Sequence, residues 1–183
     1  PLRLRGLAVL ALVASPLYLV AAGAVMTDTV QLACVTAAMA CAQQALAPGA
    51  AARWRVGFWS AVGIGTLAKG LATLALIGLP LAMYAAWRRQ IRATATALVD
   101  GRGIGIALLL ALPWYVAAEV NYPGFLDYFL IGEHWHRFVD PGWQGDRYGI
   151  AHSMPIGTIW AYAAIGIGPW LLPLLWRTVR GDV

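Results

Sequence analysis

Charged side chains are scarce in this sequence of 183 residues: they make up 11% of it, and lysine occurs only once. A soluble domain carries roughly 25% charged residues, so an ordinary soluble protein is excluded. Hydrophobic residues make up 61%, and several apolar runs approach the roughly 20 residues that cross a bilayer. We therefore expect an all-α, polytopic membrane protein, whose net charge of +5 orients its helices and does not indicate a nucleic-acid partner.

Cysteine is also rare, and Cys34 and Cys41 lie seven residues apart in one apolar run. On a helix they share a face, which argues against a disulfide between them and favours small buried hydrophobic side chains. The two residues therefore do not indicate a redox compartment.

The first residue is a proline, and the first apolar run lacks the cleavage pattern of a signal peptide. We expect residues 1–183 to form a single transmembrane domain that is an internal piece of a longer protein.

Hydropathy predicts a bundle of about six transmembrane helices, over residues 7–26, 29–46, 56–68, 71–87, 104–118 and 154–176. Pro16 lies inside the first span, where neighbouring helices can satisfy the freed carbonyl. Residues 119–153 form one long polar loop that is rich in glycine, proline and aromatic residues. Within it, residues 126–138 are predicted to form a short helix on the membrane surface.

The basic residues divide between the two sides of the membrane. Positive loops stay in the cytoplasm, so both termini are expected there. Ten arginines then lie inside: Arg3, Arg5, Arg53, Arg55, Arg88, Arg89, Arg92, Arg102, Arg177 and Arg180. The exceptions, Lys69, Arg137 and Arg147, lie outside with most of the acidic residues. This outer side is where we expect chemistry, although Arg147 belongs to no motif and receives no role.

Asp28 is expected at the outer end of the first span. A carboxylate there can act as a general base toward an acceptor hydroxyl. Thr27 and Asp28 also fit an ordinary N-cap of the second span, because Asp is favoured at that position. Both interpretations stay open.

Lys69 lies between two apolar runs, where an ammonium is costly unless it meets an anion or reaches the interface. It either extends to the headgroup level as a structural lysine or binds an anionic ligand. A ligand that carries a phosphate would suit it.

The loop contains a second group of polar side chains. In an α-helix Glu133 and Arg137 would be i,i+4 neighbours on one face. They form either a simple surface ion pair, or a site in which Glu133 orients the Arg137 guanidinium to bind a phosphate through two hydrogen bonds. His134 and His136 are two residues apart, a weak zinc signal without an evident third ligand. His152 fits either a ligand or an interfacial polar group. We therefore predict no metal and no cofactor, and the spacing does not support a divalent ion.

Several motifs occur in a fixed order along the chain: Leu67-Ala68-Lys69-Gly70, Leu112-Pro113-Trp114-Tyr115, 121–129 (NYPGFLDYF), 133–138 (EHWHRF) and Gly168-Pro169-Trp170. Together they resemble the lipid-linked-sugar glycosyltransferases of the C-type membrane fold. The nearest likeness is to the 4-amino-4-deoxy-L-arabinose lipid A transferases, which are related to protein O-mannosyltransferases. The resemblance covers roughly residues 15 to 176.

The resemblance implies a partial C-type fold, a polyprenyl-phosphate sugar donor and an acceptor that is lipid A, another glycolipid or a protein. It also implies a multi-pass protein of the bacterial inner membrane whose active face is periplasmic or extracellular. By motif, Asp28 takes a catalytic position, and Lys69, Glu133, His134 and Arg137 take substrate-binding positions. Leu71 replaces the family's usual proline, and the outer loop with the family's leading carboxylate is absent.

Three functions remain in competition. A glycosyltransferase would place polar groups at one face, as this sequence does. A transporter or flippase for a lipid-linked or anionic solute would place polar residues at mid-span and show an inverted repeat, and neither feature is evident. A non-catalytic scaffold would tolerate substitution of the outer charges.

Overall fold

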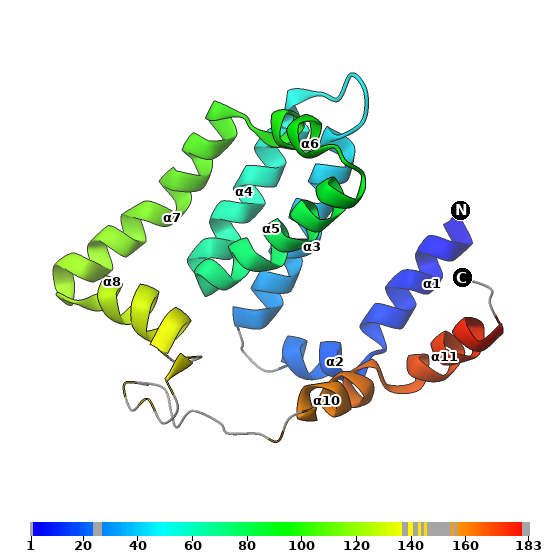
Figure 1. The fold of residues 1–183 in the computed structure, drawn as a ribbon. Coiled ribbons are helices and arrows are strands. Elements are labelled where there is room, and N and C mark those ends of the chain that lie inside the picture. The colour runs from blue at the N-terminus through cyan, green and yellow to red at the C-terminus, as the bar shows by residue number, and fades with distance from the viewer. Residues whose placement is uncertain are drawn as a thin grey trace. The chain divides into compact units, whose positions relative to one another are not determined.

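The computed structural model describes residues 2–23, 27–136, 139–140, 143, 145, 155 and 157–180. It divides into two compact units, one of residues 1–29 with 152–183 and the other of residues 30–151. All the described regular structure is helical (Figure 1). Each unit is considered by itself.

The larger unit contains most of the helices. They are α3 (Thr27–Ala45), α4 (Ala52–Lys69), α5 (Leu71–Trp87), α6 (Ile91–Leu98), α7 (Gly101–Asn121), α8 (Phe125–Asp127) and the π-helix η1 (Tyr128–His136). In Figure 1, α6 lies at one end of the group formed by α4, α5 and α7, and α8 lies at the far end of α7. The predicted fourth span coincides with α5.

Small side chains form the core of this unit. On α3 the buried residues Cys34, Ala38, Ala42 and Ala45 follow a helical spacing of three and four. The three alanines pack with Phe58 and other residues of α4 in one cluster. Close packing of small residues is how helices associate where lipid removes the hydrophobic driving force between them.

The helices α4 and α7 run parallel, with their backbones in direct contact. A Cβ atom on Gly63 would lie 2.8 Å from the Cα and 3.0 Å from the carbonyl oxygen of Ala107. One turn earlier on both helices, a Cβ atom on Gly103 would lie 2.7 Å from the Trp59 ring. Glycine at both positions therefore sets the distance between the two helices.

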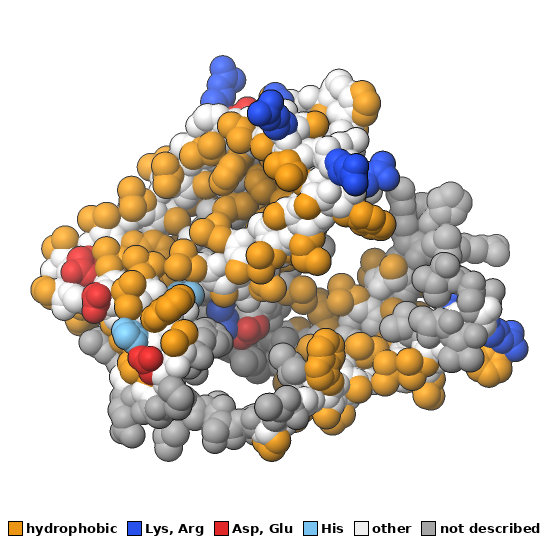
Figure 2. Space-filling model, viewed as in Figure 1, with side chains coloured by type: hydrophobic (Ala, Val, Ile, Leu, Met, Phe, Trp, Pro, Cys, Tyr) orange, Lys and Arg blue, Asp and Glu red, His pale blue; other side chains and the backbone are white. Residues whose placement is uncertain are grey.

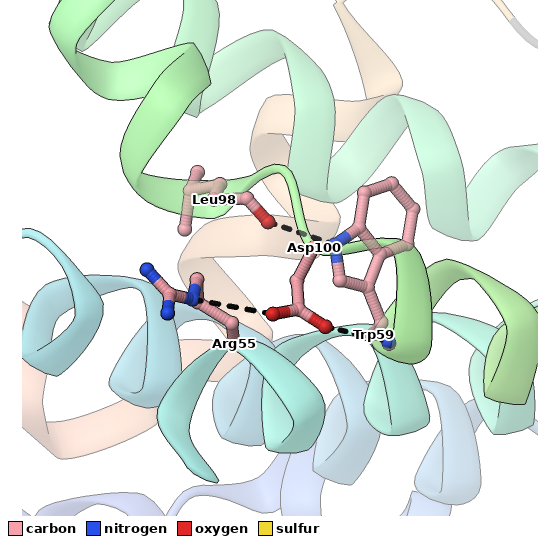
Figure 3. Close-up of polar contacts among 5 residues, drawn as sticks. Arg55, Trp59, Leu98 and Asp100 are labelled. Carbon is pink, nitrogen blue, oxygen red and sulfur yellow. Dashed lines mark hydrogen bonds and ion pairs between the residues drawn. The ribbon is translucent and has the colours of Figure 1, made fainter. Parts of the chain in front are cut away.

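Polar contacts hold the first turns of these helices together (Figure 3). Arg55 Nε lies 3.4 Å from Asp100 Oδ2, and Asp100 Oδ1 accepts a hydrogen bond of 2.9 Å from the backbone N–H of Gly103. Asp100 is thus the N-cap of α7 and also the partner of Arg55. Trp59 donates its indole N–H to the Leu98 carbonyl at 2.8 Å. Arg55, which was predicted inside, and Asp100 therefore share one end of the bundle.

The smaller unit contains α1 (Leu2–Val13), α2 (Pro16–Gly23), α10 (Thr158–Ile167), the 3-10 turn η2 (Gly168–Trp170) and α11 (Leu171–Arg180). The predicted first and sixth spans each consist of consecutive helical pieces in place of one continuous helix. Pro16 begins α2, because proline lacks the N–H that would continue α1. Gly168 has φ of 61° and lies against Pro16, where a Cβ atom would meet Pro16 Cδ at 2.7 Å.

The surface is strongly apolar. Leu79, Met83 and Leu109 expose 63%, 71% and 73% of their area, and hydrophobic side chains cover much of the face in Figure 2. One described helix, α7, is long and apolar enough to cross a membrane, and α5 is a shorter apolar helix. The count of about six spans stays a prediction. Lys and Arg side chains gather at the upper edge of this view, around the α6 end.

Substitution of Gly63 should separate α4 from α7. Because a Cβ atom there overlaps the Ala107 backbone, Gly63→Val should lower the free energy of unfolding by about 1–3 kcal/mol. Gly105→Val is the matched control, since a Cβ atom on Gly105 meets nothing within 4 Å. Thermal unfolding in nanodiscs measures both variants. Equal midpoints for the two would show that the close approach does not limit stability.

Candidate functional site

Lys69 is the last residue of α4, and a glycine turn follows it directly. Gly70 has φ of +62° and donates its N–H to the Thr66 carbonyl at 2.7 Å. A side chain at this position would be strained, because L residues rarely adopt positive φ. The break between two apolar helices that the sequence predicted at Lys69-Gly70 is confirmed. Lys69 is half-buried there and has contacts of its own.

Side-chain hydroxyls from two other helices reach the last turn of α4. Thr73 Oγ1, on α5, donates to the Gly65 carbonyl at 2.7 Å, and Tyr115 OH, on α7, donates to the Thr66 carbonyl at 2.7 Å. Gln31, on α3, donates its amide N–H to Thr73 Oγ1 at 3.3 Å. Thr73 is fully buried and Gln31 is buried, so the contacts from Gln31 through Thr73 to Gly65 are closed to solvent, while the Tyr115 contact is partly buried. Sequence reasoning missed Thr73 and Gln31, since nothing local to either residue indicates the contact.

Aromatic rings join α7 to the segment after it. Trp114 packs edge-on against Phe125 at 5.5 Å between ring centroids. Phe125 stacks on Phe129 at 5.5 Å, and Tyr115 lies 5.6 Å from Phe129. Phe129 in turn meets the His134 ring edge-on at 5.0 Å. These five rings form an aromatic row, whose packing places the start of η1 close to the end of α4.

The aromatic row ends on Gly70. A Cβ atom on Gly70 would lie 2.4 Å from Phe129 Cζ and 3.4 Å from His134 Cε1. The absence of a side chain at Gly70 therefore lets Phe129 and His134 approach the residue that follows Lys69. The structure thus brings two predicted site positions, Lys69 and His134, to the same turn.

The segment 128–136 is a π-helix, in which side chains five apart lie above one another. Tyr128 accordingly donates its hydroxyl to Glu133 Oε1, and Phe129 contacts His134. Of the helix predicted over 126–138, the described residues 126–136 are helical, but their register differs from the expected i,i+4. Its position on the membrane surface stays a prediction. Glu133 reaches Tyr128, a partner that an α-helical pattern does not indicate. π-helical turns are frequent at functional sites.

The orientation of His134 is set by a backbone carbonyl. Its Nδ1 lies 2.6 Å from the Phe129 carbonyl oxygen. Because a carbonyl oxygen only accepts, Nδ1 carries the hydrogen in this contact. In the neutral ring Nε2 then presents its lone pair as an acceptor. His134 can therefore accept a hydrogen bond from a ligand hydroxyl, or donate from both nitrogens when it is protonated.

Glu119 organises the turn between α7 and α8. Its two carboxylate oxygens accept the backbone N–H groups of Gly124 at 2.9 Å and Leu126 at 2.7 Å. Gly124 has φ of +86°, the left-handed conformation that lets the chain turn between α7 and α8. With both oxygens used in this way, Glu119 is a structural carboxylate that the sequence had not singled out.

The remaining predicted residues divide into two cases. Asp28 lies in the first turn of α3, where a carboxylate complements the helix dipole. It belongs to the smaller unit, so its proximity to Lys69 stays a prediction. Arg137, and with it Arg147 and His152, lies outside the described residues. The meeting of Arg137 with Glu133 therefore also stays a prediction.

His134 and His136 do not form part of a group of metal ligands in the described structure. His136 bonds to Asp140 through Nδ1. Over the part of the chain that the structure describes, no three His, Cys, Asp or Glu side chains lie close enough to hold a metal ion.

This chain matches the model of a known protein family and several known proteins. The model of the family described as dolichyl-phosphate-mannose-protein mannosyltransferase matches residues 4–129. An undecaprenyl phosphate-alpha-4-amino-4-deoxy-L-arabinose arabinosyl transferase 1 of Pseudomonas fluorescens is 30% identical over 117 residues, which is 62% of this chain and 19% of that protein. A transferase of the same description from Yersinia pestis is 31% identical over 112 residues, which is 61% of this chain and 18% of that protein.

A solved structure matches more of the chain. The crystal structure of ArnT from Cupriavidus metallidurans bound to undecaprenyl phosphate is 29% identical, with a TM-score of 0.72. The match covers 93% of this chain and 31% of that one. The chain thus spans about a fifth of the curated relatives and about a third of the solved structure. The expected all-α membrane fold, a partial C-type fold, is confirmed.

The contact between Gly70 and Phe129 gives a test of the site's geometry. Gly70→Ala adds backbone strain and also an overlap between the new Cβ atom and the Phe129 ring. The overlap should lower the free energy of unfolding by about 1–3 kcal/mol beyond the loss that the strain causes. Gly49→Ala is the control for a positive φ without an overlap, because Gly49 has φ of +72° and nothing within 4 Å of its Cβ position. Thermal unfolding compares the two, and equal losses would contradict the packing described.

Proposed function

Because the chain belongs to the dolichyl-phosphate-mannose-protein mannosyltransferase family, we propose that it forms part of a membrane glycosyltransferase. The donor is a sugar linked to a polyprenyl phosphate. The acceptor is a hydroxyl or phosphate group of lipid A, another glycolipid or a protein. The reaction takes place at the outer face of the bacterial inner membrane, in a multi-pass protein.

The observation that carries this proposal is the position of Lys69. It ends an apolar helix beside a turn on which an aromatic row and His134 converge. Polar groups therefore gather at the end of α4 opposite Arg55, about 21 Å away along the helix axis. A donor with its polyprenyl chain in lipid would present its phosphate at such a boundary. The solved relative, whose title names bound undecaprenyl phosphate, supports the same class of ligand.

The proposed chemistry is a transfer with inversion at the anomeric carbon. The acceptor oxygen bonds to this carbon while its bond to the phosphate oxygen breaks, and the acceptor proton passes to a carboxylate base. Negative charge grows on the departing polyprenyl phosphate, and cations aimed at it stabilise the transition state. Lys69 and Arg137 take that role. Asp28 orients or assists the acceptor.

Glu133 and His134 complete the substrate-binding set. The Tyr128 hydroxyl donates to the Glu133 carboxylate, and the Phe129 carbonyl fixes the His134 ring. Both side chains are thereby pre-oriented, which lowers the entropy lost when a sugar or phosphate binds. The named relatives are all transferases, and none supports the transporter or flippase that the sequence left open.

Removal of the Lys69 ammonium tests the proposal. Lys69→Ala and Arg137→Ala should each slow sugar transfer by at least about tenfold, or ~1.4 kcal/mol of transition-state stabilisation. The measurement is transfer from polyprenyl-phosphate sugar in membranes at equal expression. Arg88→Ala, which removes an exposed cation after α5, is the matched control and should retain activity. Wild-type turnover in both Lys69→Ala and Arg137→Ala would remove the idea.

One isosteric change at Asp28 separates catalysis from its structural role in the first turn of α3. Asn keeps the size and a side-chain oxygen of Asp but is not a base. Asp28→Asn should therefore lower the free energy of unfolding by no more than about 1 kcal/mol, the usual dipole contribution of a carboxylate there, while slowing transfer by at least about tenfold. Asp28→Ala, which also removes the side-chain oxygen, shows what the polar group adds to stability. Full activity in Asp28→Asn would leave Asp28 with a structural role alone.

A further inference from the structure

The end of a membrane helix needs hydrogen-bond donors from the protein. The last carbonyls of an α-helix lack partners within the helix, and lipid supplies none. At the end of α4, Thr66 O accepts from Gly70 N–H at 2.7 Å and from Tyr115 OH at 2.7 Å. Gly65 O accepts from Thr73 Oγ1 at 2.7 Å. Lys69 lies on this turn, so these donors hold the backbone that carries it.

The direction of the Thr73 hydrogen is set from a third helix. Gln31 donates its amide N–H to Thr73 Oγ1, which leaves the hydroxyl hydrogen for the Gly65 carbonyl. Both Gln31 and Thr73 are buried, and an unmade hydrogen bond there would be costly. The contact with Gly65 is therefore well determined.

Tyr115 adds a second contact that Thr73 does not make. Its hydroxyl reaches Thr66 while its ring lies 5.6 Å from Phe129, the ring that packs on Gly70 and His134. One side chain thus touches the turn of Lys69 and the segment of His134. A shift of Tyr115 would move these two groups relative to one another.

We propose that Tyr115 and Thr73 are positioning residues of the transfer reaction, which act through Lys69. The two hydroxyls hold the last turn of α4 so that the Lys69 ammonium meets the charge that grows on the leaving phosphate. This inference rests on the proposed function. Neither hydroxyl needs to touch substrate, and each acts through a backbone carbonyl.

The expected effect is on rate more than on folding. Loss of one of these hydrogen bonds should lower stability by an amount that leaves the bundle folded but lets the last turn of α4 shift from its position. A displacement of about 1 Å at a reacting group can nevertheless cost up to roughly a hundredfold in rate. Tyr115→Phe keeps the ring and removes only the oxygen, so it isolates the contact with Thr66.

The test is a double-mutant cycle at saturating donor. Tyr115→Phe should lower kcat about tenfold and change the donor KM less than threefold, because the misplaced ammonium is felt most in the transition state. In a Lys69→Ala background the same change should cost less than twofold, because the group that it positions is already gone. Tyr84→Phe, at an exposed tyrosine near the far end of α5, is the matched control and should be silent.

Substitutions of Thr73 give an independent test, in which one variant removes the hydroxyl and another keeps it. Thr73→Val should repeat the loss of kcat and its suppression by Lys69→Ala, while Thr73→Ser keeps the hydroxyl and should restore most of the rate. Thermal unfolding in nanodiscs checks that each variant is folded. If Tyr115→Phe does not accumulate, the Thr73 pair decides the question.

Two failures are distinguishable. If Lys69→Ala slows transfer but the Tyr115→Phe and Thr73→Val losses are the same in both backgrounds, the hydroxyls do not act through Lys69 and the inference is overturned alone. Unchanged kcat in Tyr115→Phe and Thr73→Val would also overturn it alone. If Lys69→Ala itself transfers at the wild-type rate, the role of Lys69 in the proposed function fails, and the inference falls with it.

Discussion

The direct backbone contact between α4 and α7 is the constraint on which the rest of the larger unit depends. Gly63 lies on Ala107, and the helices run parallel from that point in both directions. Toward the start, the contact allows Arg55 to pair with Asp100. Toward the end, it brings Tyr115 within reach of the Thr66 carbonyl. A larger residue at Gly63 would disturb both ends, since the two helices share one register.

The proposed site lies where this register meets an unusual backbone. The glycine after Lys69 ends α4 at a positive φ and admits the ring of Phe129. The π-helix then supplies Glu133 and His134, each already held by a partner five residues earlier. Rigid helices position the cation, and a tethered segment positions the groups that would surround a sugar. Preorganisation of this kind is what a charge-stabilising site requires.

Much of this arrangement is readable from the sequence, for identifiable reasons. Hydropathy and the glycine after Lys69 predict the bounds of α5, because both signals are local. The breaks at Pro16 and Gly168 were harder to predict, since membrane helices often continue through such residues. The π-register of residues 128–136 has no distinct pattern in the sequence. The partners of Thr73 and Tyr115 depend on tertiary packing, which composition and spacing do not specify.

The π-helix also affects how this site should be aligned with those of related proteins. A π-turn holds one more residue than an α-turn, so a relative that lacks one residue in the segment 128–136 would form an ordinary α-helix of nearly the same composition. In a sequence alignment, a gap placed one position away from the extra residue would then pair Glu133 with a residue whose side chain points in another direction. Equivalent residues in this segment are therefore best assigned by superposing structures, with the tyrosine–glutamate and phenylalanine–histidine tethers as fixed points.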